Sequence, residues 1–163
     1  MDEEVIENAE AYCARHGLRL IERLGFGVHG MVFLIAGNAE LRTAALKVLY
    51  ERVPYRRERA IYERLAEMSV TEIRGFEVPH LLDANDELLA LEMTVVTAPY
   101  VLDFAGAWLD FPPEFSDEVW QDWNQKNEEQ FAGDWPAAQA ILGELEDFGI
   151  HMLDPSPSNI RFC

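Results

Sequence analysis

The sequence lacks three features that would assign it to a membrane, a secretory route or a disulfide-bonded scaffold. No window contains the roughly 18 uninterrupted apolar residues that a transmembrane helix needs, although 49% of the 163 residues are apolar. The N-terminus, Met1-Asp2-Glu3-Glu4, is acidic, whereas signal and transit peptides begin with basic residues. The two cysteines, Cys13 and Cys163, suggest neither a metal cluster nor a disulfide framework, so we expect a cytoplasmic protein.

Basic residues are scarce in the second half of the chain, which accounts for most of the net charge of −17. Residues 1–74 hold 12 acidic and 11 basic residues, whereas residues 75–163 hold 18 acidic residues against Lys126 and Arg161 alone. A field this negative repels phosphate backbones and anionic lipids, so we expect no nucleic-acid or membrane partner. Such a field would attract a basic protein or peptide, but the interpretation that the sequence favours is an acidic surface that only keeps the protein in solution.

The first half of the chain has the pattern of a helix followed by a small sheet. Residues 2–15 carry apolar residues at helical spacing and end before Gly17. A second helix is expected over residues 54–68, because proline suits a first helical position. We therefore expect an N-terminal helix over residues 1–17, then a five-stranded antiparallel sheet with one helix over residues 18–97. The predicted strands cover residues 18–24, 31–36, 44–50, 80–83 and 88–95.

After Pro99 the pattern becomes mainly helical. Three helices are expected, over residues 101–110, 116–132 and 136–148. A proline-containing loop over residues 150–159 then leads to a short strand at 160–162. A small sheet with one helix, followed by a helical part over residues 98–163, predicts an α+β fold of two lobes.

A glycine-rich motif separates the first two predicted strands. Residues 25–32 are Gly-Phe-Gly-Val-His-Gly-Met-Val, which has the form G-x-G-x-x-G-x-V. Glycines at these positions let backbone N–H groups approach phosphate oxygens without a Cβ in between. The alternative is a glycine-rich hairpin turn that binds nothing. A Rossmann site needs a helix directly after the third glycine, and the strand pattern from Met31 to Ile35 disfavours one.

Lysine is rare in this sequence, and Lys47 lies in the middle of an apolar run. A lysine inside a central strand needs an anionic partner, which is either a carboxylate or a bound phosphate. Glu58 is the candidate carboxylate, because apolar residues three, four and seven positions later place it on the inward face of its helix. The alternatives are an edge-strand lysine that points to solvent, and a pairing with Glu63 or Glu67 in place of Glu58.

The last motif lies near the C-terminal end, where residues 149–160 are Gly-Ile-His-Met-Leu-Asp-Pro-Ser-Pro-Ser-Asn-Ile. Asp154 and Asn159 lie five positions apart on a loop that two prolines stiffen. A proton acceptor and a metal ligand could therefore meet at one point. The alternative is a proline-rich turn in which the asparagine side chain caps the backbone.

The order of these features resembles the protein-kinase family from about Leu20 to Ile160, with a glycine loop, a strand lysine, a helix glutamate, two strands, helices and then D-x-x-x-x-N. The resemblance implies that Asp154, Lys47 and Glu58 are catalytic, with Asp154 accepting the proton of the substrate hydroxyl. It makes Asn159 and Asp154 the magnesium ligands. The residues that it places around ATP are Gly25, Phe26, Gly27, Val28, Gly30, Val32, Ala45, Lys47, the hinge residues Leu91, Glu92 and Met93, and Asp103 near the ribose.

Several positions depart from the family pattern. Met152-Leu153 stands where the family has His-Arg, and Ser156 stands where serine/threonine kinases have lysine. Only four residues follow Asn159, so the D-F-G segment that supplies the main magnesium ligand is not expected after the loop. The triplet Asp147-Phe148-Gly149 precedes the loop, and we expect it to end a helix instead.

These observations lead to three hypotheses about function. The first is a kinase-like protein that binds ATP with weakly held Mg²⁺ and transfers the γ-phosphoryl group to a protein hydroxyl. The second is a pseudokinase that acts as a nucleotide-responsive or structural binding module. The third is a small-molecule kinase of the aminoglycoside-phosphotransferase type, because that type shares the D-x-x-x-x-N loop.

Overall fold

The computed structural model describes residues 1–37 and 42–163, and its architecture is α+β. The chain starts with helix α1 (Asp2–His16), as its apolar spacing predicts, and Val5, Ala9 and Cys13 are buried. Gly17 ends the helix with a φ of 65°, a left-handed conformation that glycine adopts without steric strain. No helix in the described part of the chain is both long enough and apolar enough to cross a membrane.

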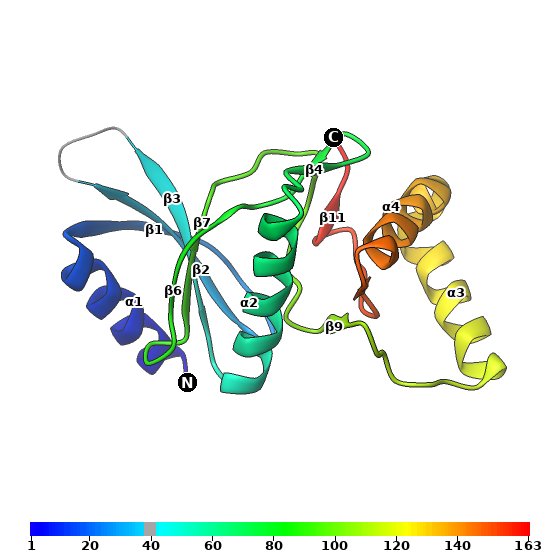
Figure 1. Cartoon of the computed structure of the whole chain (residues 1–163), viewed down its shortest axis with the longest axis horizontal. Coiled ribbons are helices and arrows are strands. Elements are labelled where there is room, and N and C mark those ends of the chain that lie inside the picture. Colours follow the sequence, from blue (N-terminus) through cyan, green and yellow to red (C-terminus); the bar gives the residue numbers. More distant parts are fainter. Residues whose placement is uncertain (38–41) are drawn as a thin grey trace.

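A five-stranded antiparallel sheet forms the N-terminal part of the molecule (Figure 1). Its spatial order is β1-β2-β3-β7-β6, so β3 lies at the centre, and six of the seven residues of β3 are buried. The five predicted strands are confirmed with small shifts of their ends. Their bounds are β1 (Leu18–Phe26), β2 (Gly30–Gly37), β3 (Thr43–Leu49), β6 (Leu81–Asn85) and β7 (Ala90–Met93).

Helix α2 (Arg52–Glu67) follows β3 and lies beside the sheet. It begins two residues before Pro54, where the sequence predicts its start. Proline is tolerated there because the first N–H groups of a helix have no intrahelical partner. The inward face of α2 is as predicted, since Glu58, Ile61, Tyr62 and Leu65 are all buried.

The predicted helix over residues 101–110 is wrong. That segment contains the short strands β8 (Tyr100–Val101) and β9 (Trp108–Leu109) with a loop between them. Val101, Phe104 and Ala105 are buried at a spacing that imitates a helix. However, positive φ angles at Asp103 (68°) and Asp110 (62°) make the chain turn at both positions.

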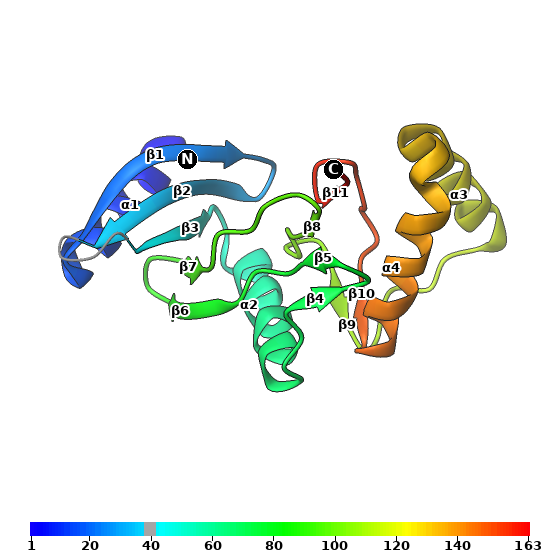
Figure 2. The same cartoon turned by 90° about the horizontal axis from the view of Figure 1, so that it is seen from above.

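The short strands join segments that are distant in the sequence. Strand β8 pairs with β11 (Ile160–Arg161), and β9 pairs with β10 (Ile150–His151), both antiparallel. Two further strands that the sequence pattern missed, β4 (Glu72–Ile73) and β5 (Phe76–Glu77), complete the small sheet β11-β8-β5-β4. Figure 2 shows that this small sheet lies between the large sheet and the C-terminal helices.

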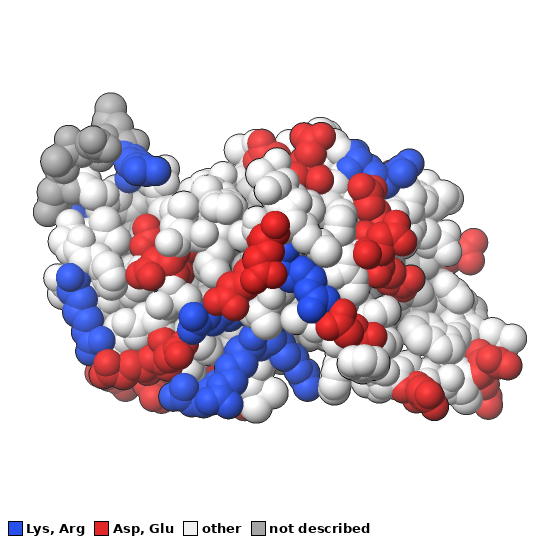
Figure 3. Space-filling view, in the orientation of Figure 1, with Lys and Arg blue, Asp and Glu red and all other residues white. Residues whose placement is uncertain are grey.

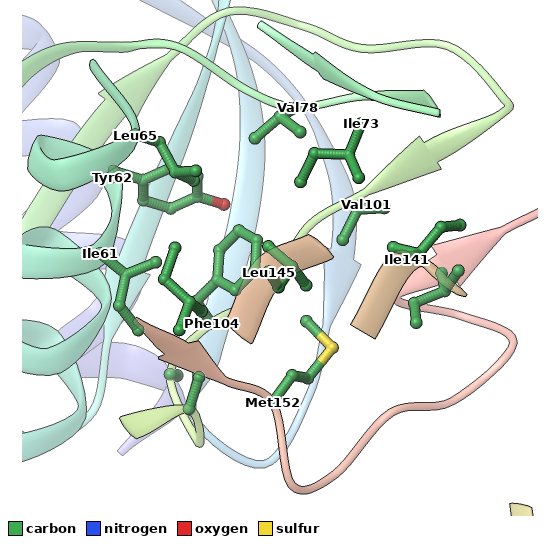
Figure 4. Close-up of a cluster of buried hydrophobic side chains, with 14 of the residues drawn as sticks. Ile61, Tyr62, Leu65, Ile73, Val78, Val101, Phe104, Ile141, Leu145 and Met152 are labelled. Carbon is green, nitrogen blue, oxygen red and sulfur yellow. The ribbon is translucent and has the colours of Figure 1, made fainter. Parts of the chain in front are cut away.

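The C-terminal helices are α3 (Asp117–Phe131) and α4 (Trp135–Asp147), and both are confirmed as predicted. Ser116 caps α3 by accepting a hydrogen bond from the N–H of Val119. One apolar core connects α4 to α2: Tyr62, Phe104, Leu145 and Met152 belong to the same cluster (Figure 4). This core fixes the helical part against the sheet and so defines the space between them.

Candidate functional site

A cavity of about 490 Å³ lies between the large sheet and the small one. This volume is within the range of small-molecule binding sites. Eleven of the residues that the sequence singles out line it: Gly25, Phe26, Gly27, Gly30, Val32, Ala45, Lys47, Glu58, Met93, Asp103 and Asn159.

Four predicted site residues do not line this cavity. Val28 is 89% exposed in the glycine loop, and Leu91 is wholly buried in the core. Glu92 lies on the opposite face of the sheet, where its carboxylate accepts a hydrogen bond from Tyr12. The predicted hinge thus meets the cavity only at Met93. Because β7 ends there and the chain leaves the sheet, the wall continues with Thr94, Val95 and Val96. The fourth residue is Asp154, which is described below.

The three glycines of the loop differ in the physical reason that favours glycine at each position. A Cβ on Gly30 would collide with the carbonyl oxygen of Val48 and lie 2.9 Å from Leu49 Cα, so β2 could not pack against β3. A Cβ on Gly25 or Gly27 would meet no atom within 4 Å, and neither residue has a positive φ. Packing therefore explains Gly30. For Gly25 and Gly27, the close approach of a ligand to the backbone is the remaining physical reason.

Lys47 lies in the wall of the cavity between two carboxylates. Its Nζ is 2.9 Å from Glu58 Oε1, 2.8 Å from Glu58 Oε2 and 2.8 Å from Asp103 Oδ1. The predicted Lys47–Glu58 pair is therefore confirmed. The rivals for this pairing are excluded, because Glu63 pairs with Arg59 on the exposed face of α2 and Glu67 is exposed.

Burial and charge act in opposite directions on this cluster. Burial lowers the pKa of Lys47, but the negative charges of Glu58 and Asp103 outweigh it and hold the pKa above its ordinary value. Burial raises the pKa of Glu58, and the ammonium group of Lys47 opposes that effect. Because the ammonium group touches both Glu58 oxygens and the N–H of Phe104 donates to Oε1, we treat the pair as ionised at neutral pH.

Asp103 occupies a position that the sequence did not reveal. It follows β8, and the N–H of Leu102 donates to the carbonyl oxygen of Asn159 over 2.9 Å, so Asp103 lies next to the end of the loop over residues 150–159. The next residue, Phe104, is buried edge-to-face against Tyr62, with ring centroids 5.3 Å apart. Asp103-Phe104 has the first two residues of a D-F-G triplet, with Ala105 at the third position. The sequence pattern places Asp103 only near the ribose, because a D-F-G segment is expected after the catalytic loop.

Asn159 closes the loop that carries Asp154. Its Oδ1 accepts a hydrogen bond from the N–H of Ser156 over 2.7 Å, and its Nδ2 donates to the carbonyl oxygen of Asp154 over 3.2 Å. The capping role that sequence reasoning left open is therefore present. A carbonyl oxygen has two lone pairs, so Oδ1 retains one for a further contact.

Asp154 lies at the other end of this loop, exposed, with its carboxylate against the backbone of Gly106. A Cβ on Gly106 would lie 2.6 Å from Oδ2 and 3.2 Å from Oδ1. Partial burial and the negative charge of Asp103 raise the pKa of Asp154. Burial alone would raise the pKa of Asp103 too, but Lys47 outweighs it and lowers that pKa. Neighbouring carboxyls with divergent pKa values suit different roles, Asp103 as a fixed negative charge and Asp154 as a proton acceptor.

Further lining residues are an imidazole and a guanidinium that the sequence analysis did not select. His29 of the glycine loop and Arg161 of β11 line the same cavity as Lys47. His29 lies inside the glycine-rich motif, between Gly27 and Gly30. That position is the sequence signal that could have identified it as a cavity residue.

Within residues 1–37 and 42–163 no group of three or more His, Cys, Asp or Glu side chains could hold a metal ion by itself. No protein-family model matches the sequence, and no curated protein matches it. The functional assignment therefore rests on the geometry of the cavity.

Proposed function

We propose that the chain binds ATP in this cavity and transfers its γ-phosphoryl group to a hydroxyl. The observation that carries the proposal is the position of Lys47. This ammonium group is fixed between two carboxylates in the cavity wall, and the same cavity is lined by two loop glycines that packing does not require. A fixed cation below a loop of accessible N–H groups is suited to a polyphosphate.

The proposed fold is that of a protein kinase with an altered order of elements. The large sheet with α2 corresponds to the N-terminal lobe, and α3, α4 and the short strands correspond to a reduced C-terminal lobe. In the kinase pattern the aspartate-phenylalanine segment follows the catalytic loop. Here Asp103-Phe104 precedes that loop, and the pairing of β8 with β11 brings the segment beside it.

The side chains at the cavity fit Mg²⁺ as a cation that arrives with ATP. Magnesium prefers oxygen ligands and is commonly bound through one or two carboxylates plus substrate phosphates. Asp103 and Asn159 in the cavity wall offer oxygen donors of this kind, and Asp154 offers another from the loop that Asn159 closes. The lowered pKa of Asp103 keeps its carboxylate charged. When bound, the ion would neutralise charge on the phosphates during transfer. Asp103 thus provides the carboxylate that the sequence pattern made us expect to be missing, and we propose a firmer metal site than the sequence implied.

The remaining chemistry is assigned to residues of this chain. Lys47 and the loop N–H groups hold the phosphates, and Glu58 holds Lys47 in place. The hydroxyl oxygen of the acceptor bonds to the γ-phosphorus as the bond from that phosphorus to the β–γ bridging oxygen breaks, and ADP leaves. Asp154 takes the hydroxyl proton, which a carboxylate with a raised pKa does more readily than an ordinary one.

The charge distribution favours a basic acceptor. In Figure 3 the end of the molecule formed by α3 shows acidic side chains and no basic ones on the visible face. A basic protein would be drawn to this region. The pseudokinase alternative rests on the magnesium carboxylate expected to be absent, and the position of Asp103 supports the enzyme over it. A small-molecule acceptor stays an alternative, and the assay below includes one.

The test of binding is calorimetric titration of the folded chain with ATP and Mg²⁺. At ATP concentrations 100 times the Kd, the unfolding free energy should rise by about 2.7 kcal/mol. Asp103→Asn should abolish most of the Mg²⁺ dependence of binding, whereas weak Mg²⁺ dependence in the wild type would argue against Asp103 as a ligand. A folded wild type that binds no ATP would exclude the proposed function.

Transfer is tested with γ-labelled ATP and two acceptors, a mixture of basic proteins and an aminoglycoside. We expect label on the protein acceptor and its loss in Asp154→Asn. Label that survives this substitution would indicate a contaminating kinase. Binding without transfer to either acceptor would support the pseudokinase alternative.

A further inference from the structure

The two-stranded ribbon formed by β9 and β10 connects the segments that carry both aspartates. Trp108 pairs with His151 and Leu109 with Ile150 in antiparallel register. The start of β9 and the end of β10 therefore lie at the same end of the ribbon. The segment with Asp103 enters at this end and the segment with Asp154 leaves from it, so the orientation of the ribbon affects the placement of both carboxylates.

Helix α2 binds this ribbon through two arginines on one face. Arg64 donates to both carboxylate oxygens of Asp110, with Nη2 2.9 Å from Oδ2, and its Nη1 also lies 3.3 Å from the carbonyl oxygen of Phe148. Arg57, two helical turns earlier, lies with its guanidinium 4.1 Å from the centroid of the Trp108 ring. We call the Arg64–Asp110 pair the clasp.

The backbone around the clasp is shaped to admit it. Asp110 has a φ of 62° and its N–H donates to the carbonyl oxygen of Gly149 over 2.8 Å. Gly149 has a φ of 78°, and a Cβ there would collide with Asp110 Oδ1 and lie 2.6 Å from Arg64 Nη1. The guanidinium therefore lies over a residue that must be glycine for the pair to form. Such a fit distinguishes the clasp from an ordinary surface ion pair, which tolerates changes in its surroundings.

The other half of α2 is attached to the large sheet. Tyr55 donates a hydrogen bond to Asp86 over 2.7 Å, and Arg59 also pairs with Asp86, in the turn between β6 and β7. Glu58 lies between Tyr55 and Arg59 in the helix, and the clasp lies further toward its C-terminal end. The helix therefore connects the sheet that carries Lys47 to the ribbon that leads to Asp103 and Asp154.

We propose that Arg64 and Asp110 are positioning residues for the nucleotide site. The clasp fixes the position of α2, and with it the Lys47–Glu58 pair, relative to Asp103 and Asp154. This inference rests on the proposed function, because this relative position matters only if phosphates and metal bind between these groups. Without the clasp, α2 would sample orientations in which Glu58 no longer holds Lys47, and only a fraction of molecules would be competent to bind ATP.

The experiment is calorimetric titration of the full chain with ATP and Mg²⁺, at a temperature where each variant is folded. If Arg64→Gln leaves one molecule in five with α2 in place, the apparent Kd rises about fivefold. Asp110→Asn preserves shape and should give a similar rise. The charge-exchanged variant, Arg64→Asp with Asp110→Arg, should recover part of the affinity. The matched control is Arg15→Gln. It removes the pair between Arg15 of α1 and Glu87 of the turn between β6 and β7, in which Nη1 lies 3.0 Å from Oε2 and Nη2 lies 3.2 Å from Oε1. This variant should leave the Kd unchanged.

A second measurement separates positioning from general loosening. In a Glu58→Gln background the contact that the clasp supports is already weakened, so adding Arg64→Gln should change the Kd by less than about twofold. Independent effects would multiply and give the same fivefold rise in both backgrounds, which would overturn the inference. Wild-type affinity in both Arg64→Gln and Asp110→Asn would overturn it too, while the proposed function stands. A folded wild type without ATP binding would overturn both.

Discussion

The two faces of the five-stranded sheet each place one donor between two carboxylates. On the face toward α2, Lys47 lies between Glu58 and Asp103. On the opposite face, under α1, the Tyr12 hydroxyl lies 2.8 Å from Asp83 and 2.5 Å from Glu92. Alternation along the strands produces this division, because Lys47 of β3 and Glu92 of β7 point to opposite faces.

The donors differ in how many protons they offer. An ammonium group has three protons and a positive charge, so Lys47 can satisfy both carboxylates and balance one of their charges. A phenol has one proton, so Tyr12 donates to one carboxylate at a time. The His16 ring is a second neighbour of Asp83, with Nε2 3.3 Å from Oδ2. Burial and the hydrogen bonds to Glu92 and Asp83 raise the pKa of Tyr12, so this hydroxyl stays neutral.

The charge of the donor therefore distinguishes the face of the proposed nucleotide site from the face that holds α1. The outer face also borders a cavity, of about 460 Å³, which His16 and Glu92 help to line. Among its described lining residues the cation is Arg42, which is exposed and is not fixed between carboxylates as Lys47 is. The contacts of Tyr12 with Asp83 and Glu92 hold α1 on the sheet. Lys47 instead lines a cavity in which its partner Asp103 is 40% exposed.

The largest expected effect comes from breaking the charged cluster. Lys47→Ala leaves Glu58, which has no exposed surface, buried without its cation. Loss of one partner of a buried pair costs about 3–5 kcal/mol of unfolding free energy. Urea unfolding at pH 7 measures it, and the double variant Lys47→Met with Glu58→Gln should recover much of the loss. A loss below about 1 kcal/mol would mean that the two donors are equivalent, contrary to the comparison.

The next effect distinguishes two kinds of glycine on the face of the proposed nucleotide site. Gly30→Ala should lower the unfolding free energy by about 1–3 kcal/mol, because the added methyl group meets the backbone of β3. Gly27→Ala should leave the unliganded protein nearly unchanged and weaken ATP binding. Thermal unfolding with and without ATP measures both. Equal destabilisation by the two variants would remove Gly27 as an indication of ligand approach.

The sequence predicted the charged pair on one face of the sheet but not the carboxylate cluster on the other. The Lys47–Glu58 pair was predictable because β-strand and helix periodicity each define an inward face. Asp83 and Glu92 were not recognised as a cluster, because their register depends on a bulge between β6 and β7 near Leu81 and Asp83. Periodicity does not report such irregularities.

The clearest failure of prediction concerns residues 101–110. Their buried positions imitate a helix, and the turns at Asp103 and Asp110 use non-glycine residues in a conformation that favours glycine. The position of Asp103 next to the loop over residues 150–159 depends on the pairing of Val101 with Ile160. Pairing between such distant residues leaves no local pattern, so the sequence did not show that Asp103 lies beside this loop.

A smaller effect tests the outer face. Tyr12→Phe removes the hydroxyl proton that Tyr12 places between Asp83 and Glu92, and the loss of such a hydrogen bond should cost about 1 kcal/mol in unfolding free energy. The affinity for ATP should not change, because the cluster lies across the sheet from the cavity. Calorimetric titration of the variant provides the check. A drop in ATP affinity as large as that caused by Arg64→Gln would show that the two faces act together.

The smallest effect concerns Asp103 in the cavity wall and Asp154 near it, whose contributions to stability should have opposite signs. The pKa of Asp103 is lowered on folding, so its charge stabilises the fold above the unfolded pKa of about 3.9, and this contribution is lost as the pH falls through the folded pKa. The pKa of Asp154 is raised, so its ionised form weakens the fold at neutral pH, and that penalty disappears as the pH falls toward the unfolded value.

Asp154→Asn should therefore slightly raise the melting temperature of the unliganded protein at pH 7 while it abolishes phosphoryl transfer. The gain should vanish near pH 3.5, where the wild-type carboxyl is largely protonated in both states. Asp103→Asn should lower the melting temperature at pH 7, and this loss should shrink as the pH falls. Calorimetric melts between pH 3.5 and 8 measure both variants against the wild type. A lower melting temperature for Asp154→Asn at pH 7 would mean that its carboxylate stabilises the loop. In that case the raised pKa would no longer support Asp154 as the proton acceptor, because a carboxylate that folding stabilises holds its proton more weakly than an ordinary one.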